Sequence, residues 1–342
     1  MTRVVEQLAE LTGFRDRDLL DVMLVGTLRD LLRPQALGIY RVVEDDQRRP
    51  RWLTRARLGE SDTVAEADPL WTELSTLPAL DDRPERARCL REEALVEVAG
   101  PPARLLFPLT TERETGGVLE VETAAPMAEE QRRTVWSILR IYRNFQSLLD
   151  YSERDTLTGL LNRKTFDECF LRLAMESAGP ARGQVGGRRQ AAPLQAYIGV
   201  IDIDHFKRVN DNPGHLIGDE VLLLLSRQMR GCFRFHDHLF RFGGEEFVVL
   251  MRCARREDAF GAFERLRQTV AAHRFPRVGQ ITVSAGLSAI RAGDSPSAAF
   301  ERADKAVYWA KQNGRNRVAD HEALVASAEL QAPRRESDVE LF

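Results

Sequence analysis

The sequence predicts an α/β protein with two domains joined by a helix. Three observations support this prediction. The chain has 342 residues, which is long enough for two separate cores. Helical and strand patterns follow one another in both halves, and residues 127–150 keep a helical pattern without proline or glycine. Hydrophobic residues make up 43% of the chain and charged residues 30%, as is usual for a globular protein.

The first 126 residues combine helical patterns with two pairs of strands. We expect helices near residues 4–11 and 16–32, strands at 36–43 and 51–58 around a polar turn, and a second strand pair at 104–109 and 117–122. This order resembles a GAF sensory domain, with PAS as the competing fold. No cysteine or histidine is placed to attach haem or bilin. A small ligand of unknown identity and a purely structural or dimerising role therefore remain equal alternatives.

Residues 127–154 are expected to form a helical stalk. Its apolar positions step by three, four, three and four residues: Val135, Ile138, Tyr142, Phe145 and Leu149. This spacing is typical of a coiled-coil seam and predicts a parallel homodimer. A helix that packs on its own domain would also be apolar on one side, so the pattern leaves that alternative open.

A buried strand in the second half ends in two aspartates. Residues 194–201 are largely apolar and lead into Asp202, Ile203 and Asp204. Strand alternation places Asp202 and Asp204 on one face. Carboxylate oxygens at a strand end are suitable ligands for Mg²⁺ together with substrate phosphates.

Two glycines and two glutamates follow in a predicted hairpin. Residues 239–242 and 247–251 form its strands, and Gly243 and Gly244 are expected to be its two-residue loop. Without side chains, these glycines would let a large anion approach the backbone. Asp202 with Glu245 and Glu246 then predicts a site for a pair of metal ions.

The segment from about 155 to 318 resembles the GGDEF domain of diguanylate cyclases. The residues that carry the resemblance are 155–163, 202–211, Gly214-His215, Gly218-Asp219, 243–247, 282–286, 303–311 and 314–316. The resemblance implies a palm-like mixed sheet flanked by helices and an enzyme that condenses two GTP into cyclic di-GMP and two pyrophosphates. Since one such site holds one GTP, it also implies a homodimer.

The resemblance assigns roles to individual positions. Asp202, the carbonyl of Ile203, Glu245 and Glu246 would hold two Mg²⁺ or Mn²⁺ ions, with Glu246 also helping to deprotonate the attacking hydroxyl. The residues that would bind GTP are His205, Phe206 and Lys207 through their backbone, Gly243 and Gly244 at the turn, Lys311 and Arg315 at the terminal phosphates, and Asn210 and Asp219 at the guanine. The sequence departs from the family at Pro213 and in an insert at residues 177–193.

An Arg-x-x-Asp pair precedes the hairpin. In the family, the position of Arg234 and Asp237 is the inhibitory site that binds product, and Arg265 is a candidate second contact. Arginine can engage guanine or phosphate while the aspartate accepts guanine N–H groups. An exposed intramolecular ion pair is the alternative.

Charge and composition exclude some classes of function. The net charge of −3 and pI of about 6.2 disfavour binding to a nucleic-acid polymer. The four cysteines lack a metal-binding spacing and are expected to be reduced. No run approaches the roughly 20 apolar residues of a membrane span, and the N-terminus lacks a secretion signal. We therefore expect a cytoplasmic protein that does not enter the membrane.

The expected organisation is a GAF-like domain at 1–126, the stalk at 127–154, the GGDEF domain at 155–322 and a tail at 323–342. Three alternatives to a regulated cyclase remain. These are a non-catalytic cyclic di-GMP receptor, a cyclase that accepts ATP, and an interaction protein whose first half and stalk are its working parts.

Overall fold

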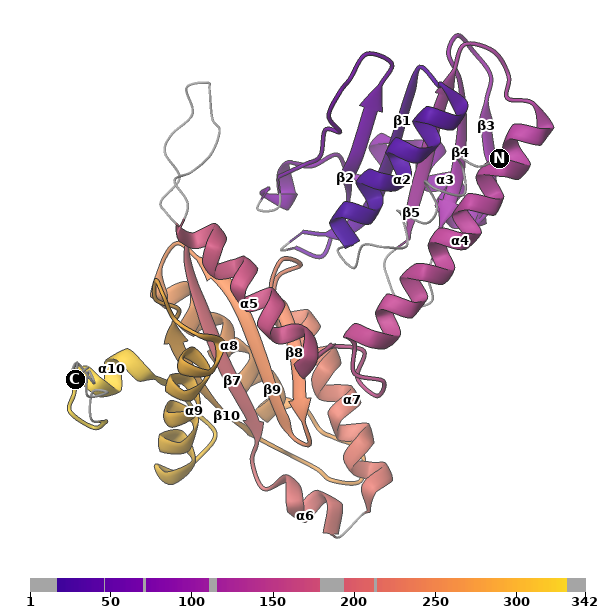
Figure 1. The fold of residues 1–342 in the computed structure, drawn as a ribbon. Coiled ribbons are helices and arrows are strands. Elements are labelled where there is room, and N and C mark those ends of the chain that lie inside the picture. Colours follow the sequence, from indigo (N-terminus) through magenta and orange to yellow (C-terminus); the bar gives the residue numbers. More distant parts are fainter. Residues whose placement is uncertain are drawn as a thin grey trace, which may run out of the picture. The chain divides into compact units, whose positions relative to one another are not determined.

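The computed structural model describes residues 17–45, 47–69, 72–110, 116–178, 194–211 and 214–330. The chain divides into two compact units, residues 1–152 and 153–342 (Figure 1). Several predictions fall outside the described residues: the helix at 4–11, most of the insert at 177–193, Pro213, and the tail from residue 331 onward.

Unit 1 contains a five-stranded antiparallel sheet in the order β2-β1-β5-β4-β3. Its strands are β1 (Ala36–Glu44), β2 (Pro50–Gly59), β3 (Val96–Val98), β4 (Ala103–Leu109) and β5 (Gly117–Thr123). Both predicted strand pairs are present, β1 with β2 and β4 with β5. The strand β3 was not predicted, because three residues are too few to show alternation.

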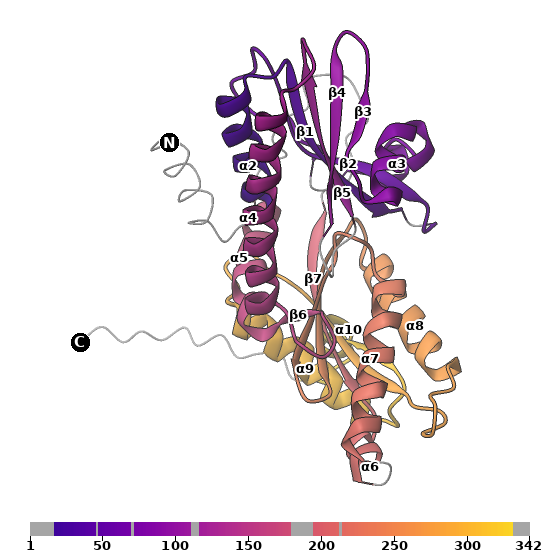
Figure 2. The ribbon, with the colours of Figure 1, turned by 90° about the vertical axis from the view of Figure 1, so that its right-hand side faces the viewer.

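Helices cover both faces of this sheet. The helices α2 (Arg17–Leu32) and α4 (Glu129–Glu153) lie on one face, and α3 (Pro84–Glu92) lies on the other (Figure 2). The core under α2 and α4 includes Leu24 and Leu28 of α2 and Ile39 and Leu119 of the sheet. Two short 3-10 turns, η1 (Leu74–Thr76) and η2 (Leu80–Asp82), precede α3.

The apolar seam of α4 is used inside unit 1. Val135, Ile138, Tyr142 and Leu149 are buried in this core, and Phe145 packs against it. The Tyr142 hydroxyl accepts a hydrogen bond from Arg41 at 2.9 Å and another from Gln146 at 2.7 Å, and it also contacts Asp21. The predicted seam therefore packs on its own domain, against the sheet and α2, and is not available to pair with the α4 helix of another chain.

Unit 2 is built on a six-stranded mixed sheet in the order β11-β10-β7-β9-β8-β6. Its strands are β6 (Leu161–Asn162), β7 (Gln195–Ile203), β8 (His238–Gly243), β9 (Glu246–Cys253), β10 (Val283–Ala289) and β11 (Val318–Asp320). The β10–β11 and β6–β8 pairs are parallel and the other pairs are antiparallel. The predicted central strand is therefore confirmed, since β7 lies between β9 and β10.

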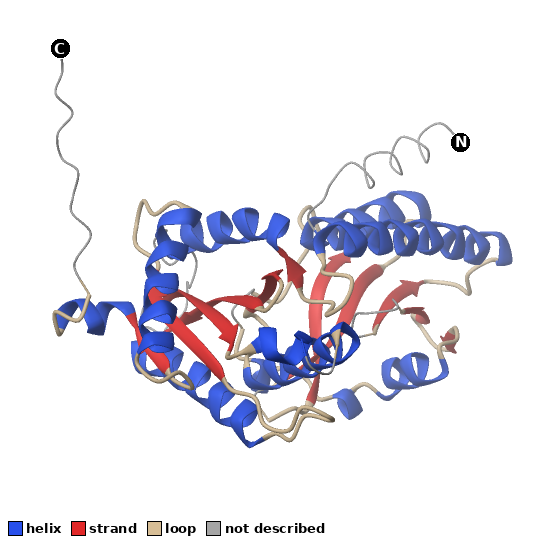
Figure 3. Ribbon diagram, turned by 90° about the horizontal axis from the view of Figure 1, so that it is seen from below, coloured by secondary structure: helices blue, strands red, loops and turns tan. Residues whose placement is uncertain are grey.

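Helices also cover both faces of the second sheet (Figure 3). They are α5 (Arg163–Ala178), α6 (Phe206–Asp211), α7 (His215–Cys232), α8 (Arg256–Ala272), α9 (Pro296–Gln312) and α10 (His321–Ala326). Figure 2 shows α5 and α9 on one side of β7 and α7 and α8 on the other.

Two glycines let helices approach this sheet closely. A Cβ atom on Gly199 of β7 would lie 2.0 Å from the ring of Phe263 in α8, and one on Gly286 of β10 would lie 2.1 Å from the carbonyl oxygen of Ala303 in α9. The backbone of α9 thus rests directly on β10. This contact fixes the distance between α9 and the sheet at the end of β7.

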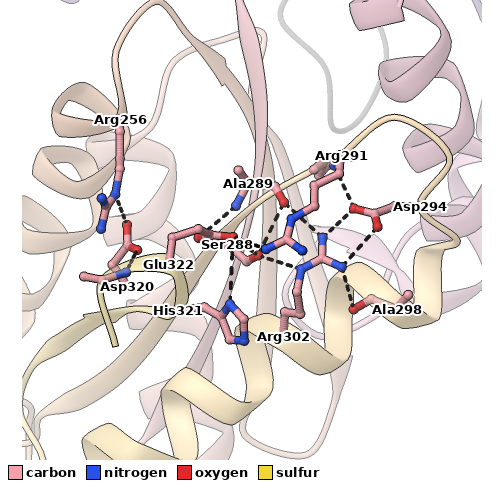
Figure 4. Close-up of polar contacts among 12 residues, drawn as sticks. Arg256, Ser288, Ala289, Arg291, Asp294, Ala298, Arg302, Asp320, His321 and Glu322 are labelled. Atoms are coloured by element: carbon pink, nitrogen blue, oxygen red, sulfur yellow. Dashed lines mark hydrogen bonds and ion pairs between the residues drawn. The ribbon is translucent and has the colours of Figure 1, made fainter. Parts of the chain in front are cut away.

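A polar network fastens α9 and α10 to β10 (Figure 4). Arg302 of α9 is buried and contacts Asp294, and its Nε donates to Ser288 Oγ at 3.1 Å. The same hydroxyl donates to Glu322 of α10 at 3.0 Å, and Arg291 also donates to Glu322, at 3.2 Å. These contacts fix α9 and α10 against β10.

No disulfide joins any of the four cysteines, as expected. Among the described helices, none is both long enough and apolar enough to cross a membrane.

Candidate active site

The end of β7 brings an aspartate beside a glutamate. Asp202 is 7% exposed and pairs with Glu246 of β9 in the antiparallel ladder. On the other side, Ser284 of β10 pairs with Asp202. Because neighbouring residues across a ladder lie about 5 Å apart, the central strand fixes the Asp202 and Glu246 backbones beside each other.

The hairpin turn differs by one residue from the prediction. Gly243 is still paired with Glu246, so the two residues of the loop are Gly244 and Glu245, not Gly243 and Gly244. The ladder shifts register between Arg241 and Gly243. This bulge uses one more residue than a regular hairpin, which moves the loop forward along the sequence.

The glycines suit both the turn and its openness. Gly244 has a φ of +50°, in the left-handed region that favours glycine. A Cβ atom added to Gly243 or Gly244 would meet nothing within 4 Å. The outer side of the turn therefore has open space beside both glycines.

The pKa of each of the three acidic side chains is raised, first of all by burial. Burial raises the pKa of Asp202, and the Lys311 ammonium offsets part of that rise. Burial and then the charge of Asp202 raise the pKa of both Glu245 and Glu246, and Asp304 of α9 adds to the effect at Glu246. Clustered like charges of this kind favour the binding of a cation.

The acidic residues at the end of β7 fit a Mg²⁺ ion that takes some of its oxygen ligands from the protein and others from the phosphates of a nucleotide. Buried Asp202 Oδ1 receives no hydrogen bond that meets normal geometry, and Glu246 lies beside it in the ladder. Oxygen ligands of this type suit Mg²⁺, which takes one or two carboxylates and completes its shell with water and phosphate. Across the described ranges, however, no three His, Cys, Asp or Glu side chains gather closely enough to hold a metal by themselves.

Lys311 reaches the same point from α9. Its Nζ lies 2.7 Å from Asp202 Oδ1. The helix ends at Gln312, and Arg315 follows with a φ of +59°, its N–H bonded to the carbonyl of Ala310 at 2.9 Å. Lys311 and Arg315 therefore do not share a helix face, although both lie at the end of α9.

Asp204 has a different role from Asp202. It is buried and accepts hydrogen bonds from the Thr282 hydroxyl at 2.6 Å, the Ser284 hydroxyl at 2.7 Å and the Asn316 N–H at 3.0 Å. These contacts tie β7 to β10 and to the loop after α9. Asp202 is thus the member of the Asp-x-Asp pair that remains for ligand binding.

Arg241 braces the turn, and sequence reasoning did not single it out. Its guanidinium donates to both oxygens of Asp155, at 3.1 and 3.2 Å, and to the carbonyl oxygen of Gly244 at 2.9 Å. The planar guanidinium forks between its two partners: Nη1 donates to Asp155, and Nε and Nη2 donate to the carbonyl oxygen of Gly244. The only signal in the sequence is a charged residue between Phe240 and Phe242 in a strand that is otherwise apolar.

Asn210, one of the two predicted guanine-binding residues, rests against the residue before the other, Asp219. A Cβ atom on Gly218 of α7 would lie 2.1 Å from Asn210 Oδ1, so the amide of Asn210 rests against the start of α7, next to Asp219. His205 has a φ of +59° and turns the chain from β7 into α6, whose first residue, Phe206, is buried in the core. His205 and Lys207 are exposed at this turn.

The predicted inhibitory pair forms a closed turn. Asp237 Oδ2 accepts a hydrogen bond from the Arg234 N–H at 2.8 Å. Arg265, on α8, donates to the carbonyl oxygen of Cys232 at 2.5 Å, two residues before Arg234. All three predicted residues thus lie around the end of α7, separate from the acidic turn.

The site thus combines a central strand that ends in an aspartate, an acidic hairpin turn beside that strand, and a lysine on the aspartate. Residues 152–317 match the family model described as Diguanylate cyclase, GGDEF domain. This part of the chain is therefore a GGDEF domain.

Several proteins of known type are similar to this chain. Diguanylate cyclase DgcP of Pseudomonas aeruginosa is 44% identical over 167 residues, which are 48% of this chain and 23% of that protein. Diguanylate cyclase DgcZ of Escherichia coli is 38% identical over 169 residues, or 48% of this chain and 52% of that protein. The chain thus spans about a quarter of the first relative and about half of the second. The solved structure of the active GGEEF domain of a diguanylate cyclase from Vibrio cholerae is 35% identical, with 47% of this chain and 97% of that chain covered and a TM-score of 0.41.

Proposed function

We propose that the protein is a diguanylate cyclase that condenses two GTP molecules into cyclic di-GMP and two pyrophosphates. The observation that carries the proposal is the pairing of Asp202 with Glu246 at the end of β7, with the Lys311 ammonium on the same carboxylate. The match of residues 152–317 to the cyclase domain supports it.

Each step forms a bond between a 3′-oxygen and an α-phosphorus and breaks the bond from that phosphorus to the leaving pyrophosphate. Glu246, at the open turn, would accept the proton of the hydroxyl. Asp202, the Ile203 carbonyl, Glu245 and Glu246 would hold two Mg²⁺ or Mn²⁺ ions, which supply positive charge against the charge developing on the phosphate. Lys311 and Arg315 would bind the terminal phosphates.

The substrate is proposed to be GTP because the amide of Asn210 rests against Gly218 in the first turn of α7, and the next residue, Asp219, supplies a carboxylate. Asn210 and Asp219 can donate to and accept from the guanine edge, respectively. The backbone at His205, Phe206 and Lys207, with the open turn at Gly243 and Gly244, would receive the phosphates.

Two subunits are needed because each site supplies one nucleotide of the product. The buried seam of α4 does not offer a surface for this pairing, but the opposite face of the helix does. Ile141, Leu148 and Tyr151 are 37%, 66% and 77% exposed, and with Asn144 they step by three, four and three residues. We propose that this outer stripe forms the parallel homodimer contact, since such steps produce a coiled-coil seam and a polar residue in it fixes the register.

Two regulatory roles complete the proposal. Arg234, Asp237 and Arg265 would bind cyclic di-GMP and slow the enzyme, as the site around the end of α7 combines guanidinium and carboxylate groups. Unit 1 would act as a GAF-like sensory domain with a small ligand. Its exit helix α4 is anchored to β1 through Tyr142 and Arg41 and leads directly toward Asp155.

The test is to incubate the purified protein with GTP and Mg²⁺ and to separate the nucleotides, with mass measured by light scattering in parallel. Formation of cyclic di-GMP by the wild type and its loss in Glu246→Gln support the proposal. Binding of cyclic di-GMP without turnover would instead identify a receptor. Equal use of ATP would identify a cyclase of different substrate choice, and neither turnover nor binding would leave an interaction protein.

A further inference from the structure

The ammonium of Lys311 lies against the carboxylate of Asp202. Its Nζ lies 2.7 Å from Asp202 Oδ1, a distance typical of a charged hydrogen bond. The Asp202 side chain is 9% exposed and the Lys311 side chain 32%. The contact is therefore a close ion pair on a largely buried carboxylate.

The same ammonium lowers the electrostatic repulsion of the whole acidic cluster. Its charge opposes the rise in pKa at Asp202, Glu245, Glu246 and Asp304. A divalent cation on Asp202 would meet this positive charge within a few ångströms. Two cations on one carboxylate oxygen repel each other, and burial reduces the screening by water.

Lys311 can leave this position without any movement of the helix. It sits in the last turn of α9, which ends at Gln312. The backbone of α9 is packed on Gly286 and cannot shift easily. A lysine stem has four rotatable carbons, and its ammonium is a compact charge that binds carboxylate and phosphate equally well.

We propose that the Lys311 ammonium acts as a built-in cation at Asp202 and competes with Mg²⁺ for that carboxylate until a triphosphate draws the ammonium away. Metal and nucleotide then bind with positive coupling, because each removes an obstacle to the other. The proposal rests on the proposed function only in naming the triphosphate. The competition between the ammonium and the metal does not depend on catalysis.

The experiment measures binding of Mn²⁺ alone to the nucleotide-free protein by electron paramagnetic resonance, with Mg²⁺ as a competitor. Lys311→Met should bind Mn²⁺ at least about five-fold more tightly than the wild type. Lys311→Arg keeps the charge and should bind weakly, as the wild type does. Asp202→Asn in the Lys311→Met background should lose the gain, which places the ion on Asp202.

A matched control is available on the same helix. Lys305 forms an ion pair with Glu301 at 2.8 Å on the exposed side of α9. Lys305→Met removes the same charge but should leave Mn²⁺ affinity unchanged. An equal gain in both variants would show a general charge effect and would overturn the proposal.

A second measurement tests the coupling. A non-hydrolysable GTP analogue should tighten Mn²⁺ binding to the wild type more than to Lys311→Met. Unchanged or weaker Mn²⁺ binding in a folded Lys311→Met protein contradicts the competition, even if the wild type makes cyclic di-GMP. Conversely, tighter binding in Lys311→Met without any turnover by the wild type supports the competition and refutes only the cyclase.

Discussion

The guanidinium of Arg241 donates to both carboxylate oxygens of Asp155 and also holds the carbonyl oxygen of Gly244. Asp155 in turn accepts the N–H of Thr158 at 2.8 Å and its hydroxyl at 2.7 Å. Arg241 therefore links Asp155, in the opening motif of the domain, to the acidic turn. Residues 86 positions apart in the sequence set the orientation of Glu245 and Glu246.

Arg241→Met should lower kcat about 100-fold with a small change in KM, because it releases the turn without removing a ligand of the nucleotide. Arg241→Lys keeps the charge but loses the fork and should recover only part of the rate. Steady-state kinetics with GTP measure both values. Arg255→Met is the control. Arg255 forms an exposed ion pair with Asp258 at 2.9 Å, and it follows the end of β9 that lies away from the turn. Equal rates in Arg241→Met and Arg255→Met would refute a positioning role.

Glu246→Gln should make the metal-free protein more stable to heat while reducing cyclase activity by at least about 100-fold. The pKa of Glu246 is raised by burial, by Asp202 and by Asp304. A carboxyl group with a raised pKa contributes stability at low pH that is lost as the pH rises through the folded-state pKa. At neutral pH its charge therefore destabilises the fold, and the neutral amide removes that cost.

Thermal melts of wild type and Glu246→Gln with and without Mg²⁺ check this expectation. The gain in melting temperature should vanish below the ordinary glutamate pKa, near 4.5. Mg²⁺ should stabilise the wild type more than the variant. A lower melting temperature for Glu246→Gln in metal-free buffer at neutral pH would contradict the assigned repulsion.

The sequence predicted which residues come together at the end of β7 better than it predicted how they are arranged. Asp202, Glu246 and Lys311 could be found because the polar residues at these positions interrupt apolar strands or follow known spacings. The one-residue displacement of the loop could not be predicted, because it depends on a bulge at Phe242 that no local sequence pattern indicates. The brace between Arg241 and Asp155 also escaped detection, because it forms only when distant segments meet.

The seam of α4 shows the same limit in the first unit. Val135, Ile138, Tyr142 and Leu149 have the spacing of a coiled coil, but that spacing is also the spacing of any helix packed on a sheet. The choice between the two depends on what lies nearby in space. Here the sheet of unit 1 and α2 cover these residues, and a second apolar stripe remains outside.

Acid should weaken the attachment of α10 to β10. Burial would raise the pKa of Glu322, but hydrogen bonds from His321, Ser288 and the backbone hold it at about 2. A depressed carboxyl pKa contributes stability above the unfolded value of 4.5, and this stability is lost as the pH falls toward about 2. The contribution at neutral pH is at most about 3 kcal/mol.

Glu322→Gln should therefore lower the free energy of unfolding at pH 7 and flatten its decline between pH 4.5 and about 2. Urea titrations across this range measure the effect. Glu301→Gln is the control, because its partner Lys305 is exposed and such pairs contribute little. A Glu322→Gln protein whose acid dependence matches that of the wild type would show that the network is not responsible.

Two glycine-to-alanine substitutions should have opposite effects. Gly286→Ala places a methyl group 2.1 Å from the Ala303 carbonyl and should destabilise the fold by about 1–3 kcal/mol, since α9 must move off β10. Gly261→Ala adds a methyl group to α8 with no atom within 4 Å and should stabilise by about 0.5–1 kcal/mol. Chemical denaturation gives both values. If Gly286→Ala proved as stable as the wild type, the close seating of α9 would be wrong.

The outer stripe of α4 should control pairing of subunits without supporting the fold of unit 1. Leu148 is 66% exposed, so Leu148→Glu costs little packing within the subunit, but it would bury a charge in each half of the proposed contact. We expect a monomer by light scattering, a melting temperature close to that of the wild type at equal concentration of monomer, and loss of most cyclase activity. Glu is also a good helix former, so α4 itself should persist.

The companion variant is Tyr142→Phe, on the buried face of the same helix. It removes the hydroxyl that accepts from Arg41 and Gln146 and leaves these buried groups without that partner, which costs about 1–3 kcal/mol. It should therefore lower the melting temperature while the protein stays dimeric. A monomeric Tyr142→Phe beside a dimeric Leu148→Glu would place the subunit contact on the buried seam and exclude the outer stripe.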